Sequence, residues 1–171
     1  MKRSCCAALL ALSLPLAAIT ISAQTPAAPA KPATAKPATA KPAAGGRLVE
    51  ITGGDDMKFS VTEIAAKRGE TVRIQLKNVG TLPKMAMAHN VVVLTPTANV
   101  ADFTTAAATA RDTDFVPASK KAEILAATAL AGPGETVEVS FKVPAAAGTY
   151  PFICSFPGHA TAGMKGNFVV K

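Results

Sequence analysis

The stretch "TVRIQLKN", residues 71–78, alternates apolar and polar side chains with a period of two. Val72, Ile74 and Leu76 fall on one side, and the residues between them are polar. Such alternation is typical of a β-strand that buries one face. A second stretch, "ETVEVSFKV" at residues 135–143, has the same pattern. The sequence therefore predicts two strands that each turn one face to a hydrophobic core.

Shorter apolar runs predict six further strands, at residues 48–52, 57–64, 89–94, 123–128, 149–154 and 167–170. Turn signals such as "GGDD", "KRGE", "NVG" and "AGPGE" separate several of them. About eight short strands favour an antiparallel two-sheet sandwich over any helical fold. Residues 99–122 carry an Ala-rich run that predicts a short helix within an inserted flap, which we interpret as mostly structural. The predicted fold class is all-β, a sandwich with a short helical insertion.

The first 46 residues have a different organisation. Residues 1–23 have a basic start, an apolar run and small residues at the end, the pattern of an export signal peptide. Cys5 and Cys6 precede the apolar run and would leave with it. Residues 24–46 contain a repeat of Ala, Pro, Lys and Thr, whose prolines block helix formation, and this predicts a flexible linker. Residues 47–171 are then one domain, tethered to a membrane only if the signal stays uncleaved.

The formal net charge of +7 comes almost entirely from the N-terminal segment. Six of the 18 basic residues precede Leu48, whereas all 11 acidic residues follow it, so 12 basic and 11 acidic residues leave +1 on the rest. Nucleic-acid binding needs clustered Lys and Arg side chains, and the domain has no such cluster. We therefore expect no nucleic-acid partner.

The stretch "CSFPGHATAGMKG", residues 154–166, carries three possible metal donors. They are the thiol of Cys154, the imidazole of His159 and the thioether of Met164. His89 begins a predicted strand, and this strand can bring a second imidazole to the same end of the sandwich. Two imidazoles, one thiolate and a weak axial thioether suit copper in both oxidation states.

Other interpretations of these residues fit less well. A lone cysteine is ordinarily a small buried hydrophobe. Structural zinc normally takes four Cys or His ligands, and catalytic zinc keeps a position open for water. A Cys-His nucleophilic pair needs an orienting third group and an oxyanion hole, and the sequence indicates neither. We therefore expect no enzymatic activity and no catalytic residues.

Four motifs give the domain a family resemblance: "GGDDMKF" at residues 53–59, "LPKMAMAHN" at 82–90, "CSFPGH" at 154–159 and "MKG" at 164–166. With these motifs the domain resembles the cupredoxins, the blue copper proteins, and among them the azurin-like members. The resemblance implies a Greek-key β-sandwich that holds one type 1 copper ion. It also implies one-electron transfer in the bacterial periplasm between larger redox partners such as cytochromes or oxidoreductases, by a protein that we expect to be a monomer.

The resemblance assigns roles to particular residues. The strong ligands are His89, Cys154 and His159, the axial ligand is Met164, and the backbone of Ala88 makes a weak further contact. Hydrogen bonds from Asn90 and Ser155 hold the ligand loops. The partner-docking patch around the edge of His159 consists of Met57, Leu82, Ala86, Met87, Phe156 and Pro157.

The sequence departs from the azurin pattern in three places. "HATAGM" has one residue more between the second histidine and the methionine, Ala88 replaces a glycine, and no cysteine lies between residues 48 and 153 to form a disulfide. Two other functions share parts of the pattern. One is storage or delivery of copper, and the other is an adhesive sandwich module without metal.

Overall fold

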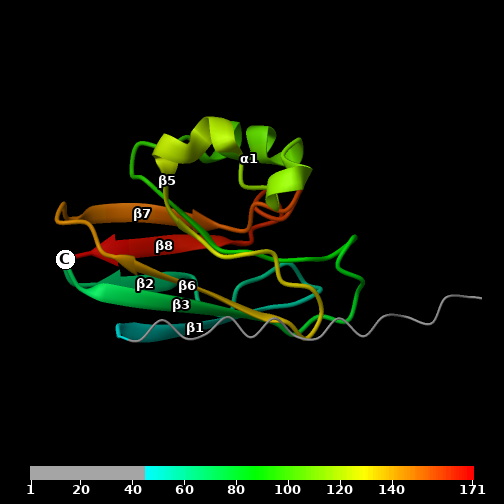
Figure 1. Cartoon of the computed structure of the whole chain (residues 1–171), viewed down its shortest axis with the longest axis horizontal. Coiled ribbons are helices and arrows are strands. Elements are labelled where there is room, and N and C mark those ends of the chain that lie inside the picture. Colours follow the sequence, from blue (N-terminus) through cyan, green and yellow to red (C-terminus); the bar gives the residue numbers. More distant parts are fainter. Residues whose placement is uncertain (1–44) are drawn as a thin grey trace, which may run out of the picture. The chain divides into compact units, whose positions relative to one another are not determined.

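The computed structural model describes residues 45–171, so the predicted signal peptide, nearly all of the linker, Cys5 and Cys6 lie outside the described residues. The described part contains two β-sheets and one α-helix (Figure 1). The first sheet has the order β1-β3-β6, and the second has the order β2-β8-β7-β4-β5. The strands of the first sheet are β1 (Arg47–Gly53), β3 (Thr71–Asn78) and β6 (Thr136–Lys142). Those of the second are β2 (Glu63–Ala66), β8 (Lys165–Val170), β7 (Gly148–Ile153), β4 (Val92–Leu94) and β5 (Ile124–Ala127).

The two sheets bury one hydrophobic core between them. Val72, Ile74 and Leu76 of β3 are fully buried, and they belong to the same cluster as Phe152 of β7 and Phe168 of β8. Alternate residues of β3 point inward, as the period of two predicts, because successive side chains of a strand point to opposite faces. The predicted all-β sandwich of eight strands with a short helix is thus confirmed.

The predicted antiparallel pairing holds for most strand pairs but is wrong for two of them. β1 pairs in parallel with β3, and β2 pairs in parallel with β8. After β1 the chain crosses to the second sheet, forms β2 there, and returns to the first sheet as β3. Because β1 and β3 are joined by this crossover and not by a hairpin, they run in the same direction.

The strand predicted at residues 57–64 is also wrong for most of its length. Only Glu63–Ala66 forms a strand, and Phe59 makes an isolated bridge with Gly53. Met57 has a positive φ of 53°, and its N–H donates to Gly54 O at 3.0 Å, so the chain turns sharply at this point. The apolar alternation here marks a segment that crosses from one sheet to the other while burying Phe59.

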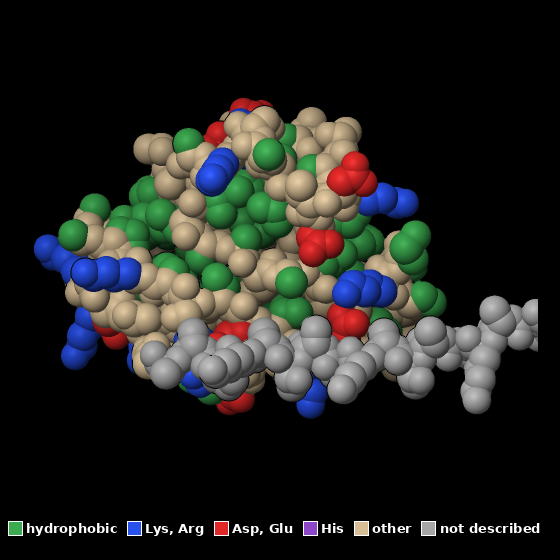
Figure 2. Space-filling view, in the orientation of Figure 1, with side chains coloured by type: hydrophobic (Ala, Val, Ile, Leu, Met, Phe, Trp, Pro, Cys, Tyr) green, Lys and Arg blue, Asp and Glu red, His purple; other side chains and the backbone are tan. Residues whose placement is uncertain are grey.

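The inserted flap contains α1 (Val100–Ala108) and two 3₁₀ turns, η1 (Arg111–Thr113) and η2 (Ala118–Glu123). The helix begins where Asn99 accepts hydrogen bonds from the N–H groups of Ala101 and Asp102, a typical N-cap. Its buried residues belong to a second hydrophobic cluster with residues of β4 and β7. On the face shown in Figure 2, hydrophobic side chains gather in a band below this flap. Within residues 45–171, no helix is long and apolar enough to cross a membrane.

Candidate metal centre

Two chain segments bring three donor residues to the same end of the sandwich. His89 follows the loop after β3, and its backbone makes an antiparallel bridge with Ala131. The N–H of His89 donates to Ala131 O at 3.0 Å, and the N–H of Ala131 donates to His89 O at 2.7 Å. Cys154 lies directly after β7, and His159 lies in the turn that leads toward β8. The sequence prediction that these three residues meet is therefore confirmed.

The three donor atoms form a nearly regular triangle. His89 Nδ1 lies 3.2 Å from His159 Nδ1, and Cys154 Sγ lies 4.0 Å from His89 Nδ1 and 3.5 Å from His159 Nδ1. A point in the plane of this triangle lies about 2.1 Å from all three atoms, close to usual metal–nitrogen and metal–sulfur bond lengths. The donors therefore fit one metal ion without rearrangement.

Burial makes all three groups favour their uncharged forms in the metal-free protein. The side chains of His89 and Cys154 are fully buried, and His159 is only 3% exposed. Burial raises the pKa of the Cys154 thiol to about 11, although backbone N–H groups partly oppose this. Burial, and secondarily the charge of His89, lowers the pKa of His159 to about 4. Burial also lowers the pKa of His89, while the Gly54 backbone and Asp55 act in the opposite direction.

The loop from Cys154 to Met164 is closed by its own backbone. The N–H of Cys154 donates to Met164 O at 3.0 Å, and the N–H of Met164 donates to His159 O at 2.9 Å. Lys58 adds a contact from outside, since its Nζ donates to Ala162 O at 3.1 Å. The segment "HATAGM", which contains the extra residue, is therefore held by hydrogen bonds at His159, Ala162 and Met164.

Gly53 provides the space in which Met164 and His89 meet. A Cβ atom at residue 53 would lie 2.6 Å from Met164 Cε and 3.4 Å from His89 Cδ2. The first distance is shorter than any ordinary carbon contact, so a side chain at this position would displace the thioether. Met164 itself is fully buried. The sequence suggests only a turn at "GGDD", and the close approach becomes visible once the end of β1 and the loop before β8 are placed together.

Asn90 and Ser155 join the two ligand segments. Asn90 Oδ1 accepts from the backbone N–H of Ser155 at 2.8 Å, and Asn90 Nδ2 donates to Ser155 Oγ at 2.8 Å. Both side chains are buried. Because each residue follows a metal donor directly, these bonds fix the spacing between His89 and Cys154.

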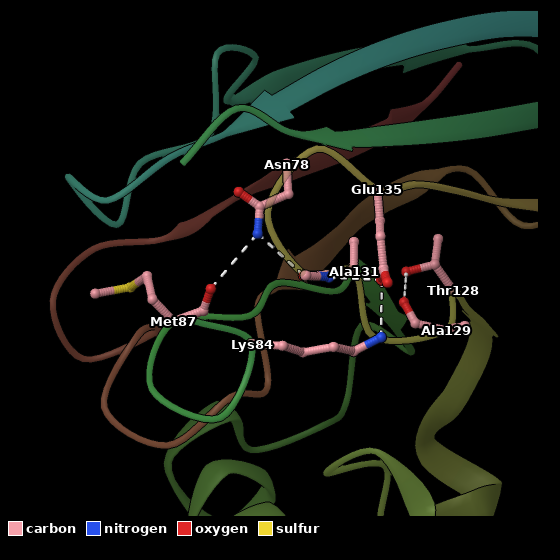
Figure 3. Close-up of polar contacts among 8 residues, drawn as sticks. Asn78, Lys84, Met87, Thr128, Ala129, Ala131 and Glu135 are labelled. Carbon is pink, nitrogen blue, oxygen red and sulfur yellow. Dashed lines mark hydrogen bonds and ion pairs between the residues drawn. The ribbon is translucent and has the colours of Figure 1, made fainter. Parts of the chain in front are cut away.

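Asn78 holds the other side of the loop that carries His89 (Figure 3). Its Nδ2 donates to Ala131 O at 3.0 Å and approaches Met87 O at 3.5 Å, while its Oδ1 accepts from the Gly80 N–H at 2.8 Å. Ala131 O is also the acceptor for the His89 N–H. The sequence offered a signal for this residue, because Asn78 continues the inward positions of "TVRIQLKN" with a polar side chain.

The family model for "Copper binding proteins, plastocyanin/azurin family" matches residues 47–171. The chain belongs to the plastocyanin/azurin family. Copper is accordingly the metal that His89, Cys154 and His159 are positioned to bind. The match and the trigonal nitrogen and sulfur donors agree, since imidazole and thiolate together are ligands that suit copper.

Other members of the plastocyanin/azurin family resemble the chain over most of the domain. Azurin from Alcaligenes faecalis is 39% identical over 121 residues, which cover 69% of this chain and 93% of that protein. Auracyanin-B from Chloroflexus aurantiacus is 38% identical over 117 residues, or 68% of this chain and 48% of that protein. The solved structure of auracyanin A, a "blue" copper protein from Chloroflexus aurantiacus, aligns with a TM-score of 0.66 at 36% identity, covering 74% of this chain and all of that one.

The residues predicted to form a docking patch differ in exposure. Leu82, Ala86 and Pro157 are exposed, whereas Met57, Met87 and Phe156 are half-buried. Met85, which the sequence prediction left out, has the most exposed of the large hydrophobic side chains in residues 45–171, at 76%. It lies in the same loop as Leu82 and Met87, and its place inside "LPKMAMAHN" was the available signal.

Proposed function

We propose that this protein is an exported electron carrier that transfers single electrons between redox partners. The observation that carries this proposal is the closed set of His89, Cys154 and His159, whose donor atoms already surround one point in the metal-free chain. Electron transfer is fast when the ligands keep their positions in both oxidation states. A donor set that needs no rearrangement meets this condition.

A bound copper ion would supply the one-electron couple between Cu(II) and Cu(I). The thiolate sulfur favours Cu(I), and the two imidazoles hold Cu(II). We propose that Met164 would help to hold the ion, because its buried side chain and the His89 ring both approach Gly53. The backbone of Ala88, a fully buried residue beside His89, would add a weak contact to the ion.

The hydrogen bonds between Asn90 and Ser155 hold the two ligand segments. We propose that these bonds also adjust the properties of the bound metal. Hydrogen bonds around metal ligands fix their orientation and adjust the properties of the metal. Both residues are buried, so water cannot readily replace these bonds. Removal of either partner should therefore change the spectrum and not only the stability.

Electrons would enter and leave at the edge of His159, through the patch formed by Met57, Leu82, Ala86, Met87, Phe156 and Pro157, to which we add Met85. A small apolar patch favours brief contacts with partners that dissociate after each transfer. Cytochromes or oxidoreductases of the periplasm are the proposed partners, and we expect the carrier to be monomeric.

The proposal is tested by copper loading and electron exchange. The protein loaded with Cu(II) is expected to be intensely blue, and Cys154→Ser to be colourless because the thiolate-to-copper transition is lost. The reduced protein should then transfer one electron per copper to an oxidised cytochrome in stopped-flow measurements. A Cu(II)-loaded wild-type protein without blue colour, or a Cys154→Ser variant that kept the colour, would contradict the assignment of these residues as the ligands.

Copper storage or delivery is distinguished by the rate of metal exchange. A buried ligand set predicts slow loss of Cu(I) to a competing chelator compared with electron transfer. A protein that loses its copper faster than it transfers electrons would be a delivery protein, and the electron-carrier proposal would be rejected.

A further inference from the structure

The flap between β4 and β5 contacts residues of the candidate metal centre at the turn Asp114–Phe115. We propose that Phe115 is a positioning residue for the imidazole of His159 and acts through the ring of Phe156. The inference deepens the proposed function, since it rests on His159 being a copper ligand. It gives the flap a role that the sequence alone did not suggest.

Three aromatic rings lie in sequence from the flap to the metal centre. The Phe115 and Phe156 ring centroids are 5.0 Å apart with an interplanar angle of 66°, an edge-to-face arrangement. The Phe156 and His159 centroids are 4.7 Å apart at 38°. The His159 and His89 centroids are 5.0 Å apart at 46°. The His159 ring therefore contacts both a second donor residue and a phenyl ring that Phe115 supports.

Phe156 is the link between two parts of the interior. It packs against the main core between the sheets and also against the flap cluster, which contains Phe115 and Phe103. The Phe115 side chain is only 6% exposed. Loss of its ring would leave a space beside Phe156, and Phe156 would relax into that space and away from His159.

The backbone of the turn is strained at Asp114 and Phe115, and this conformation directs the Phe115 ring toward Phe156. Asp114 and Phe115 both have positive φ angles, 54° and 60°, which are unfavourable for residues with a Cβ. Such conformations persist where the surrounding structure enforces them, and they gather at functional sites. Here the N–H of Phe115 donates to Ala110 O at 2.9 Å, and the N–H of Asp114 donates to Arg111 O at 3.2 Å.

A hydrogen bond ties the same turn to a second residue of the metal centre. Asn90 Nδ2, which donates to Ser155, also donates to Asp114 O at 3.1 Å. The flap therefore contacts both histidine segments, since Asn90 follows His89 and Phe156 precedes His159 in the turn. This bond fixes the position of the strained turn relative to the ligands.

The test compares Phe115→Leu with Phe103→Leu. Phe103 lies fully buried in α1 and in the same cluster, and within residues 45–171 no ring contact joins it to Phe156. In the copper-free protein, we expect Phe115→Leu to shift and broaden the NMR signals of the His159 ring. In the copper-loaded protein, we expect a shifted blue absorption band and about 2- to 10-fold faster release of copper to a chelator. Phe103→Leu should lower the melting temperature without these changes.

Two further variants complete the design. Phe115→Tyr keeps the aromatic edge and should restore the His159 signals and the release rate. Phe115→Met has a flexible, unbranched side chain without a ring that can fill an irregular space, and it replaces Phe115→Leu if that variant does not fold. Equal effects of the Phe115 and Phe103 variants on the His159 ring and on copper release would overturn the inference. A protein that binds copper but fails to exchange electrons would reject the proposed function alone, because these readouts would be unaffected.

Discussion

At the scale of single residues, the candidate metal centre is set by burial. Cys154 is the one free cysteine in the described part of the chain, and it is fully buried beside two imidazoles. A buried thiol is protected from oxidation but is also kept protonated, because burial raises its pKa. The metal ion must therefore displace a proton to obtain its thiolate ligand.

The first prediction concerns this proton. Copper uptake between about pH 7 and 9 should release about one proton per ion, since the thiol pKa is about 11 and the lowered pKa values of both histidines leave their rings neutral. Calorimetry in two buffers with different ionisation enthalpies measures the proton count. Cys154→Ser should bind copper with less proton release. Binding without proton release would mean that Cys154 is already a thiolate in the metal-free protein.

At the scale of elements, the loop from Val79 to Ala88 has no regular structure, and side chains from neighbouring segments hold it in place. Asp55 accepts hydrogen bonds from the N–H and the hydroxyl of Thr81, both at 2.9 Å. The ion pair between Lys84 and Glu135 is exposed and contributes little. Asn78 is the buried member of this set. Its Nδ2 approaches Met87 O at one end of the loop, as Figure 3 shows, and its Oδ1 accepts from the Gly80 N–H at the other end.

The second prediction compares Asn78→Ala with Asn99→Ala. Each change removes an amide that bonds two or more backbone groups, and each should lower the free energy of unfolding by about 1–2 kcal/mol. Asn99 caps α1, and its side chain bonds the N–H groups of Ala101 and Asp102 and not the ligand loop. Urea unfolding should give similar losses, whereas copper release should accelerate only in Asn78→Ala. Equal release rates would show that Asn78 supports the fold and not the ligand loop.

At the scale of the whole molecule, metal binding and folding are linked. The described chain buries the imidazoles of His89 and His159. The donor group that they form with Cys154 contains no carboxylate that could balance a positive charge on either ring. Because the pKa of His159 is lowered to about 4 in the folded protein, the unfolded chain binds a proton at a higher pH than the folded chain does. The stability from keeping this ring neutral is complete above about pH 6.5 and is lost as the pH falls toward 4.

The third prediction follows from this linkage. The copper-free protein should lose up to about 3 kcal/mol of its free energy of unfolding between about pH 6.5 and 4, as judged from urea unfolding at several pH values. Copper-loaded protein should stay stable over the upper part of this range, because a ligand that binds only the folded state adds stability. Carboxylates with lowered pKa values, such as those of Glu70 and Glu135, reduce the free energy of unfolding mainly below about pH 4.5. Their contribution is therefore separated in pH from that of His159. A flat profile between pH 6.5 and 4.5 would contradict the prediction.

The sequence by itself determined the strands and the donor residues. Alternation in "TVRIQLKN" defines which side chains are buried, because side-chain direction in a strand is local. The donor types at residues 89, 154, 159 and 164 are equally local, since the chemistry of a thiol, an imidazole or a thioether does not depend on the fold. The predicted strand at residues 57–64 was wrong because the same apolar alternation also suits a buried segment that crosses between sheets.

Only the tertiary structure decided which segments meet. Parallel pairing of β1 with β3 depends on a crossover through the other sheet, which no local pattern encodes. The space that Gly53 leaves for Met164 and the contact of Phe115 with Phe156 each join residues that are distant in the sequence. Sequence periodicity reports the burial of a residue but not its neighbour across the core. The ligands, and Asn90 and Ser155 beside them, could therefore be named from the sequence, whereas the contacts of Gly53 and Phe115 around them could be identified only from the fold.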